Sequence, residues 1–102
     1  FEAATEKNPH NAEFLRGLGW AEFNAGNRLK GIAYLKKAQE LEPSNVNILL
    51  DLANTYLLNV DFDEAKQYAQ KALHLDPGNI LARQVFDKIC QFQRDYGRAT
   101  NQ

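Results

Sequence analysis

Apolar residues recur along this chain at spacings of three and four positions, which is the period of one face of an α-helix. Leu49, Leu52 and Tyr56 show this spacing, and Phe86 and Ile89 repeat it farther along the chain. Nowhere does a run of Val, Ile, Thr and aromatic residues alternate with polar residues over five positions, as a half-buried strand requires. The pattern therefore predicts an all-α protein.

Turn residues interrupt the helical pattern at a fixed interval. Pro9, Pro43 and Pro77 are 34 residues apart each time, and each is followed two positions later by an asparagine. Proline prevents the preceding helix from continuing, and asparagine is a preferred N-cap of the next helix. A further break falls between the prolines, at 25–27, at 59–61 and again at 93–95. Each 34-residue unit is thus predicted to hold two helices.

These breaks set the expected helix bounds. The first helices of the units are predicted at Ala12–Asn24, Val46–Leu58 and Ile80–Gln93, and the second helices at Arg28–Leu41 and Phe62–Leu75. At the start of the last of these, Asp61-x-x-Glu64 has the spacing of a capping box with Asp in place of Ser or Thr.

Neither helix of a unit can bury its apolar face alone, so we expect the units to stack on one another. Small residues stand at matching places where helices would cross closely. They are Gly19 and Ala53 in the first helices and Gly31 and Ala65 in the second ones. A larger side chain there would force the two backbones apart. The expected architecture is a helix-turn-helix solenoid of antiparallel helix pairs.

The residues at these positions resemble the tetratricopeptide repeat family, whose pattern is W-x₂-L-G-x₂-Y, then A-x₃-F, then P. The second unit reads Leu49-x₂-Leu52-Ala53-x₂-Tyr56, then Ala65-x₃-Ala69, then Pro77. The first unit follows the same frame but has Glu22 where the family has tyrosine. The resemblance covers Ala12 to about Phe92 and implies a right-handed superhelix of stacked helix pairs.

The repeat frame divides the chain into segments. Residues 12–45 form repeat one and 46–79 repeat two, while 1–8 match the end of a second helix and are expected to belong to a truncated preceding repeat. Asp87 replaces the small residue of the pattern in the third unit. Residues 80–93 are therefore either a capping helix or the first helix of repeat three. Residues 94–102 are either a tail or a truncated second helix.

Composition and motifs argue against several kinds of function. A net charge of −1 offers no basic patch for nucleic acid, and no run of about 18 apolar residues could cross a membrane. The single Cys90 excludes an internal disulfide and is expected to be a small buried hydrophobe. His10 and His74 lie near turns and are expected at the surface. We expect that the chain is not an enzyme and binds no cofactor. We also expect no metal site, because no ligand spacing typical of a metal occurs.

In the family that the chain resembles, the first helices line the concave face, and partners bind there. Carried over by repeat position, this predicts a groove of fifteen residues: Glu13, Arg16, Trp20, Phe23, Asn24, Asn47, Leu50, Asn54, Leu57, Leu58, Leu81, Gln84, Lys88, Gln91 and Phe92. Seven are large and apolar, more than a solvent-facing groove should expose, and five are amides that can pair with a peptide backbone.

Part of this apolar stripe has a second interpretation. Leu57 and Leu58 would pack on Phe62 across the turn, and Trp20 would wedge against Leu50, as ordinary core residues. Some members of the family bind chain-end carboxylates with a clamp of Lys/Arg and Asn. Arg16, Asn54 and Lys88 match its positions, whereas Trp20 and Gln84 do not, so we do not expect the clamp.

Two functions follow from this surface. The first is a protein–protein interaction scaffold that binds a peptide or an amphipathic helix of a partner in the groove. The alternative is a structural module that forms homo-oligomers through exposed apolar surface, either this stripe or the end at Phe1–Ala4. The sequence does not indicate the compartment or the partner.

Overall fold

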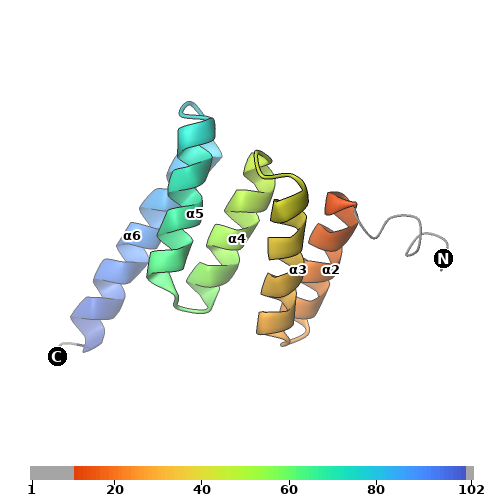
Figure 1. Ribbon diagram of the computed structural model, residues 1–102. Helices are drawn as coiled ribbons and strands as arrows, with labels where there is room; N and C mark the ends of the chain where they lie inside the picture. The colour runs from red at the N-terminus through yellow and green to blue at the C-terminus, as the bar shows by residue number, and fades with distance from the viewer. Residues whose placement is uncertain (1–10, 101–102) are drawn as a thin grey trace.

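A computed structural model describes residues 11–100, and that part of the chain is entirely helical, without a strand. Its helices are α2 (Ala12–Asn24), α3 (Arg28–Leu41), α4 (Val46–Leu58), α5 (Phe62–Leu75) and α6 (Ile80–Thr100). The antiparallel pairs α2/α3 and α4/α5 lie side by side, and α6 follows as a single long helix against the second pair (Figure 1). This is the predicted all-α stack of helix pairs.

The bounds predicted for α2, α3, α4 and α5 are confirmed, and the asparagines after the prolines act as N-caps. The Oδ1 atom of Asn11 accepts a hydrogen bond from the backbone N–H of Phe14 at 3.0 Å. The Oδ1 atom of Asn45 accepts from the N–H groups of Asn47 at 3.0 Å and Ile48 at 3.3 Å. The Oδ1 atom of Asn79 accepts from the N–H of Ala82 at 2.9 Å. Each bond satisfies an amide that the first turn of a helix leaves without an intrahelical partner.

The capping box predicted at Asp61 is wrong. The side chain of Asp61 makes no cap hydrogen bond to α5, and its Oδ2 instead accepts from Asn59 Nδ2 at 2.8 Å. The turn before it is closed by backbone in the left-handed region, at Val60 with φ +64°, where the corresponding turn of the first pair has Gly26 with φ +98°. Asparagine and aspartate within this turn thus bond to each other rather than to the helix.

The break predicted at 93–95 is also wrong, because α6 continues without interruption to Thr100. The turns at 25–27 and 59–61 each place a residue in the left-handed region, glycine in one and valine in the other, whereas residues 93–95 keep helical backbone within α6. Side chains bridge the expected break along the helix: Arg94 Nη2 donates to Gln91 Oε1 at 2.8 Å, and Gln91 Nε2 donates to Asp95 Oδ1 at 3.1 Å. Residues 94–100 therefore extend α6 and form neither a tail nor a second helix.

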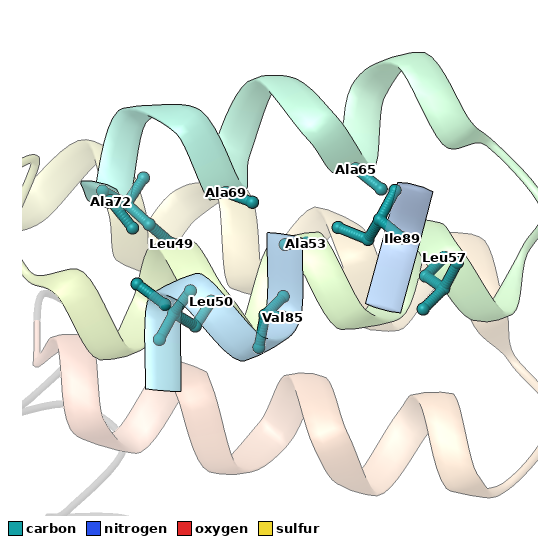
Figure 2. Close-up of a cluster of buried hydrophobic side chains, with 10 residues drawn as sticks. Leu49, Leu50, Ala53, Leu57, Ala65, Ala69, Ala72, Val85 and Ile89 are labelled. Carbon is teal, nitrogen blue, oxygen red and sulfur yellow. The ribbon is translucent and has the colours of Figure 1, made fainter. Parts of the chain in front are cut away.

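The apolar side chains form two cores that meet at α4. The amino-terminal core contains Ala12, Leu15, Phe23, Ile32, Leu35, Ala38, Ile48 and Leu52. The carboxy-terminal core contains Leu49, Leu50, Ala53, Leu57, Ala65, Ala69, Ala72, Ala82, Val85 and Ile89. Figure 2 shows the alanines of α5 facing the leucines of α4, with Val85 and Ile89 of α6 closing the cluster. The small side chains on α5 let it approach α4 closely.

Candidate partner-binding surface

The fifteen residues of the predicted groove fall into three classes of exposure. Nine are exposed: Glu13, Asn24, Asn47, Leu58, Leu81, Gln84, Lys88, Gln91 and Phe92. Three are half-buried, namely Arg16, Trp20 and Asn54, and three are buried, namely Phe23, Leu50 and Leu57. All fifteen lie on α2, α4 or α6, the first helices of the repeat frame.

The expected continuous apolar stripe is interrupted, because three of its seven members are core residues. Leu50 and Leu57 are 3% and 5% exposed and pack with Val85 and Ile89, since α6 lies against α4 (Figure 2). Phe23 is 7% exposed in the amino-terminal core. Helical spacing predicted these three residues on the face of the groove. In the structure, neighbouring helices of the stack partly cover that side of each helix.

Trp20 lies at the edge of the amino-terminal core. Its ring meets Phe23 edge-on, with centroids 5.8 Å apart and an interplanar angle of 79°. The guanidinium of Arg28 lies 5.8 Å from the Phe23 ring centroid on this side of the molecule. Trp20 is therefore a half-buried residue that packs against the amino-terminal core.

Arg16 is neutralised by carboxylates of its own chain. Its Nε donates to Oδ2 of Asp51 on α4, and its Nη1 donates to Glu13 Oε2 at 3.2 Å. The hydrogen bond to Asp51, followed by the attraction of that carboxylate, raises the pKa of Arg16 further above its ordinary range. A basic residue held in two ion pairs is poorly placed to receive the carboxylate of a ligand.

The sequence analysis missed Asp51 as a member of this surface. A signal was present, because Asp51 stands 35 residues after Arg16, one position beyond the repeat interval and on the neighbouring first helix. Because the first helices of adjacent repeats stack, residues about one repeat interval apart on them come close together. Opposite charges 35 residues apart on these helices therefore predict an ion pair between the repeats.

Asn54 has the one buried side-chain polar atom in the described part of the chain that lacks a hydrogen-bond partner, its Oδ1. The residue lies in the middle of α4, on the same helical face as Asn47 seven positions before it and Leu58 four positions after it. A buried acceptor without a donor costs about 1–3 kcal/mol. This face of α4 thus holds an unfilled acceptor at its centre.

Two adjoining hollows lie at the end of α4, where the α4–α5 turn meets the later turns of α6. The larger, of about 470 Å³, is lined by Leu57, Leu58, Val60, Phe62, Phe92, Asp95 and Tyr96. The smaller, of about 370 Å³, is lined by Val60, Asp61, Phe62, Asp63, Glu64 and Gln93. Tyr96 and Val60 were not predicted as site residues, because the sequence analysis ended the third helix at Gln93.

The remaining candidate residues are placed as follows. Cys90 on α6 is half-buried rather than fully buried as expected. His74 is exposed near the end of α5, as expected, and His10 lies outside the described residues, as do 1–8. Among the described side chains, His, Cys, Asp and Glu form no group of three that could hold a metal. No helix within residues 11–100 is long and apolar enough to span a membrane.

The fold, the repeat interval and the family models agree on the class of protein. A tetratricopeptide repeat model matches residues 25–85, and a second model of that description matches residues 1–38. The chain belongs to the tetratricopeptide repeat family. Repeats of this kind are protein–protein interaction scaffolds, and the chain has that architecture.

Among curated proteins, the chain is similar to a peroxisomal targeting signal receptor and to a peroxisome biogenesis protein. It is 40% identical over 65 residues to the peroxisomal targeting signal receptor of Pichia angusta, covering 64% of this chain and 11% of that protein. It is 30% identical over 103 residues to peroxisome biogenesis protein 5 of Arabidopsis thaliana, covering 99% of this chain and 14% of that protein. The chain thus spans about a seventh or less of the length of these relatives.

Solved structures confirm the fold. The first TPR of Spaghetti (RPAP3) bound to the HSP90 peptide SRMEEVD has a TM-score of 0.75 and 21% identity, covering 85% of this chain and 69% of that one. The MamA protein has a TM-score of 0.77 and 22% identity, covering 95% of this chain and 53% of that one. At this level of identity the likeness concerns the fold alone.

Proposed function

We propose that the chain binds a peptide segment of a partner protein across the face of α2, α4 and α6, with Asn54 as the central contact. The observation that carries this proposal is the buried, unpartnered Oδ1 of Asn54. In the free chain this oxygen is closed off from solvent, so a ligand reaches it only if the Asn54 side chain, which is half-buried as a whole, turns outward. A peptide backbone N–H would then supply the donor that the oxygen lacks, and the Nδ2 group would donate to a peptide carbonyl. Binding would offset the cost that the unpaired oxygen imposes on the free protein.

Exposed polar residues stand on the same helices as this central amide. Asn47 on α4 and Gln84 and Lys88 on α6 are exposed, whereas Gln91 is already bonded to Arg94 and Asp95. Amides donate and accept at once, so they suit the alternating groups of an extended backbone. The half-exposed indole of Trp20 adds an apolar contact for one side chain of the peptide.

An extended peptide suits this face better than an amphipathic helix. A helix would need a continuous apolar stripe to cover, whereas Phe23, Leu50 and Leu57 are already buried. A carboxylate-ended peptide held by Arg16 is also disfavoured, because Asp51 and Glu13 occupy that guanidinium. Similar proteins support the kind of partner: one neighbour is described as bound to a peptide, and one relative is named a targeting signal receptor.

Selection from a displayed library of random peptides tests the proposal. Peptides enriched on the 102-residue chain should include a set that binds the Asn54→Ala variant at least about tenfold more weakly, which corresponds to about 1.4 kcal/mol. Gln67→Ala, an exposed amide on α5, is the matched control and should leave their affinity unchanged. If no selected peptide distinguishes Asn54→Ala from this control, the proposal is wrong.

Self-assembly is the alternative function, and exposed apolar side chains on α6 favour it. Leu81 and Phe92 are 54% and 49% exposed, so a second copy could cover them. Light scattering over a wide range of protein concentrations separates the two functions. A monomer at every concentration contradicts self-assembly and leaves peptide binding as the function of this face.

A further inference from the structure

We propose that the two hollows between the α4–α5 turn and the later turns of α6 form a second docking surface, for a positively charged segment of a partner protein that carries a large apolar side chain. This surface is called the turn pocket below. It shares Leu57, Leu58 and Phe92 with the predicted groove, but its other lining residues lie in the α4–α5 turn, in α5 and in the later turns of α6. Its function does not depend on that of Asn54.

The floor of the turn pocket is apolar and accessible. Leu58, Phe92 and Tyr96 line the larger hollow and are 53%, 49% and 52% exposed. Tyr96 also contacts Phe62, with ring centroids 5.5 Å apart, so the aromatic side chains form one wall. A hollow of about 470 Å³ falls in the range of small-ligand pockets and is large enough for one bulky side chain.

This wall exists because α6 does not stop where the repeat frame predicts. Tyr96 lies in the part of α6 beyond Gln93, and Figure 1 shows α6 running on past the level of the α4–α5 turn toward the C-terminus. A chain that turned at 93–95 would direct Tyr96 into a new helix instead. The pocket is therefore a property of this uninterrupted helix.

The rim of the turn pocket is negatively charged. Val60 and Phe62 line both hollows, so the apolar floor continues directly into a part lined by Asp61, Asp63 and Glu64. Asp95 adds a fourth carboxylate on the side of α6. No Lys or Arg lines either hollow; Arg28 is near, its Nη1 donating to the backbone oxygen of Leu58 at 3.3 Å. Among the described residues none of these four carboxylates takes part in an ion pair, although Asp61 accepts from Asn59 and Asp95 accepts from Gln91.

Helix capping does not account for all of this charge. Asp63 and Glu64 lie in the first turn of α5, where acids are favourable to the helix dipole, but Asp61 makes no cap bond. Asp95 comes from the second half of α6 and lines the larger hollow together with Phe62, the first residue of α5. Carboxylates from the α4–α5 turn, α5 and α6 thus border two hollows that share Val60 and Phe62, and the complementary partner carries Lys or Arg beside its apolar side chain.

A second copy of the chain is a poorer occupant. In a symmetric dimer the same patch would face itself, which would place the four carboxylates opposite their own equivalents. Like charges brought together at an interface cost free energy and suppress that partner. A basic segment brings no like charges to the carboxylates, and its affinity for the turn pocket should fall as salt is added.

The test uses a displayed library of random peptides selected on the wild-type chain and then measured on variants. Leu58→Ser with Phe92→Ser removes the exposed apolar floor without touching the buried core. Leu41→Ser with Leu75→Ser, at the ends of α3 and α5, is the matched control of similar exposure. We expect a set of peptides rich in Lys or Arg beside Phe, Trp or Leu that loses at least about tenfold in affinity on the first variant and nothing on the control.

The charge is tested with the triple variant Asp61→Asn, Asp63→Asn and Glu64→Gln. This variant should bind the same peptides at least about threefold more weakly at low salt, and its affinity for them should depend less on salt concentration. Peptides of this set should bind the Asn54→Ala variant with unchanged affinity. The proposal for the Asn54 face and the proposal for the turn pocket can therefore be contradicted independently.

Three outcomes would overturn the proposal. The first is that no selected peptide depends on Leu58 and Phe92. The second is that the dependent peptides are acidic or uncharged. The third is that light scattering shows concentration-dependent association that the Leu58→Ser, Phe92→Ser variant abolishes, which would make a second copy the occupant.

Discussion

Gly19 of α2 and Gly31 of α3 lie backbone against backbone: a Cβ added at Gly31 would come within 2.6 Å of the Gly19 carbonyl oxygen. A Cβ added at Gly19 would in turn lie 2.9 Å from the carbonyl oxygen of Gly31 and 2.8 Å from Leu35 Cγ. The two helices can approach so closely only because both residues lack a side chain, as the repeat frame predicted.

We predict that Gly31→Ala lowers the free energy of unfolding by about 1–3 kcal/mol, even though alanine is the better helix former. The clash is with backbone atoms, including the N atom of Phe23 at 2.8 Å, so it cannot be relieved by a rotamer change. Urea denaturation followed by circular dichroism measures the effect. Gly17→Ala is the matched control in α2, since a Cβ there meets nothing within 4 Å, and it should stabilise by up to about 1 kcal/mol. Equal effects of the two substitutions would contradict the close crossing.

Val60 is expected to be a site of backbone strain. It has φ +64°, and the left-handed region costs an L-residue about 1–2 kcal/mol, with β-branched side chains among the least suited. Val60→Gly should therefore raise the urea midpoint, by an amount worth about 1 kcal/mol. The reciprocal change Gly26→Val, at φ +98°, should lower it by at least as much. A destabilising Val60→Gly would show that the packing of the valine outweighs its strain.

The ion pair between Arg16 and Asp51 should contribute measurably to stability, because both side chains are shielded, at 28% and 14% exposure. A double-mutant cycle with Arg16→Gln and Asp51→Asn is expected to give a coupling energy on the order of 1–2 kcal/mol. The pair Lys30–Glu22 is the control, with Nζ and Oε2 3.8 Å apart and side chains 62% and 26% exposed, and its coupling should stay below about 0.5 kcal/mol. Indistinguishable couplings would mean that the bridge between α2 and α4 stabilises no more than a surface pair.

Stability should fall at alkaline pH. Burial, and then the proximity of Tyr56, raises the pKa of Tyr68 above its ordinary value, because the phenolate is harder to accommodate than the phenol. A raised folded-state pKa contributes stability that is complete below the unfolded pKa, near 10, and is lost as pH rises through the folded value. Denaturation between pH 8 and about 11 should show this loss. Tyr68→Phe should make the fall shallower, whereas Tyr96→Phe, at an exposed ring, should change it little; identical slopes would be evidence against Tyr68 as the source.

Local sequence rules predicted the helices well, because the signals are chemical and short in range. Proline followed by a capping asparagine marks the start of the first helix of each unit, and Asn11, Asn45 and Asn79 all cap as expected. The repeat interval then indicated that the helix pairs stack. The third break was predicted only from the alignment of the units: residues 93–95, like 59–61, contain no glycine, so turn chemistry did not distinguish a turn from a continuing helix there.

The candidate surface was harder to predict, since burial depends on the next helix in the stack. Helical spacing put Leu50 and Leu57 on one face with Asn54, but it could not show that α6 covers the leucines or that the Asn54 oxygen is closed off from solvent without a partner. For this reason substitutions of Leu50 and Leu57 would disturb the core and are unsuitable as tests of binding. Asp51 was overlooked because its role arises from α2, which lies in another repeat.

Helix α4 belongs to both cores, with Ile48 and Leu52 in one and Leu49, Leu50, Ala53 and Leu57 in the other. The two outer parts of the molecule can therefore open only by exposing one side of this helix, and opening both exposes it completely. The amides of α4 should be the last to exchange their hydrogens with solvent, at rates set by global rather than local unfolding. A ligand bound to Asn54 would contact the helix that unfolds last, so its binding free energy would stabilise both cores against unfolding.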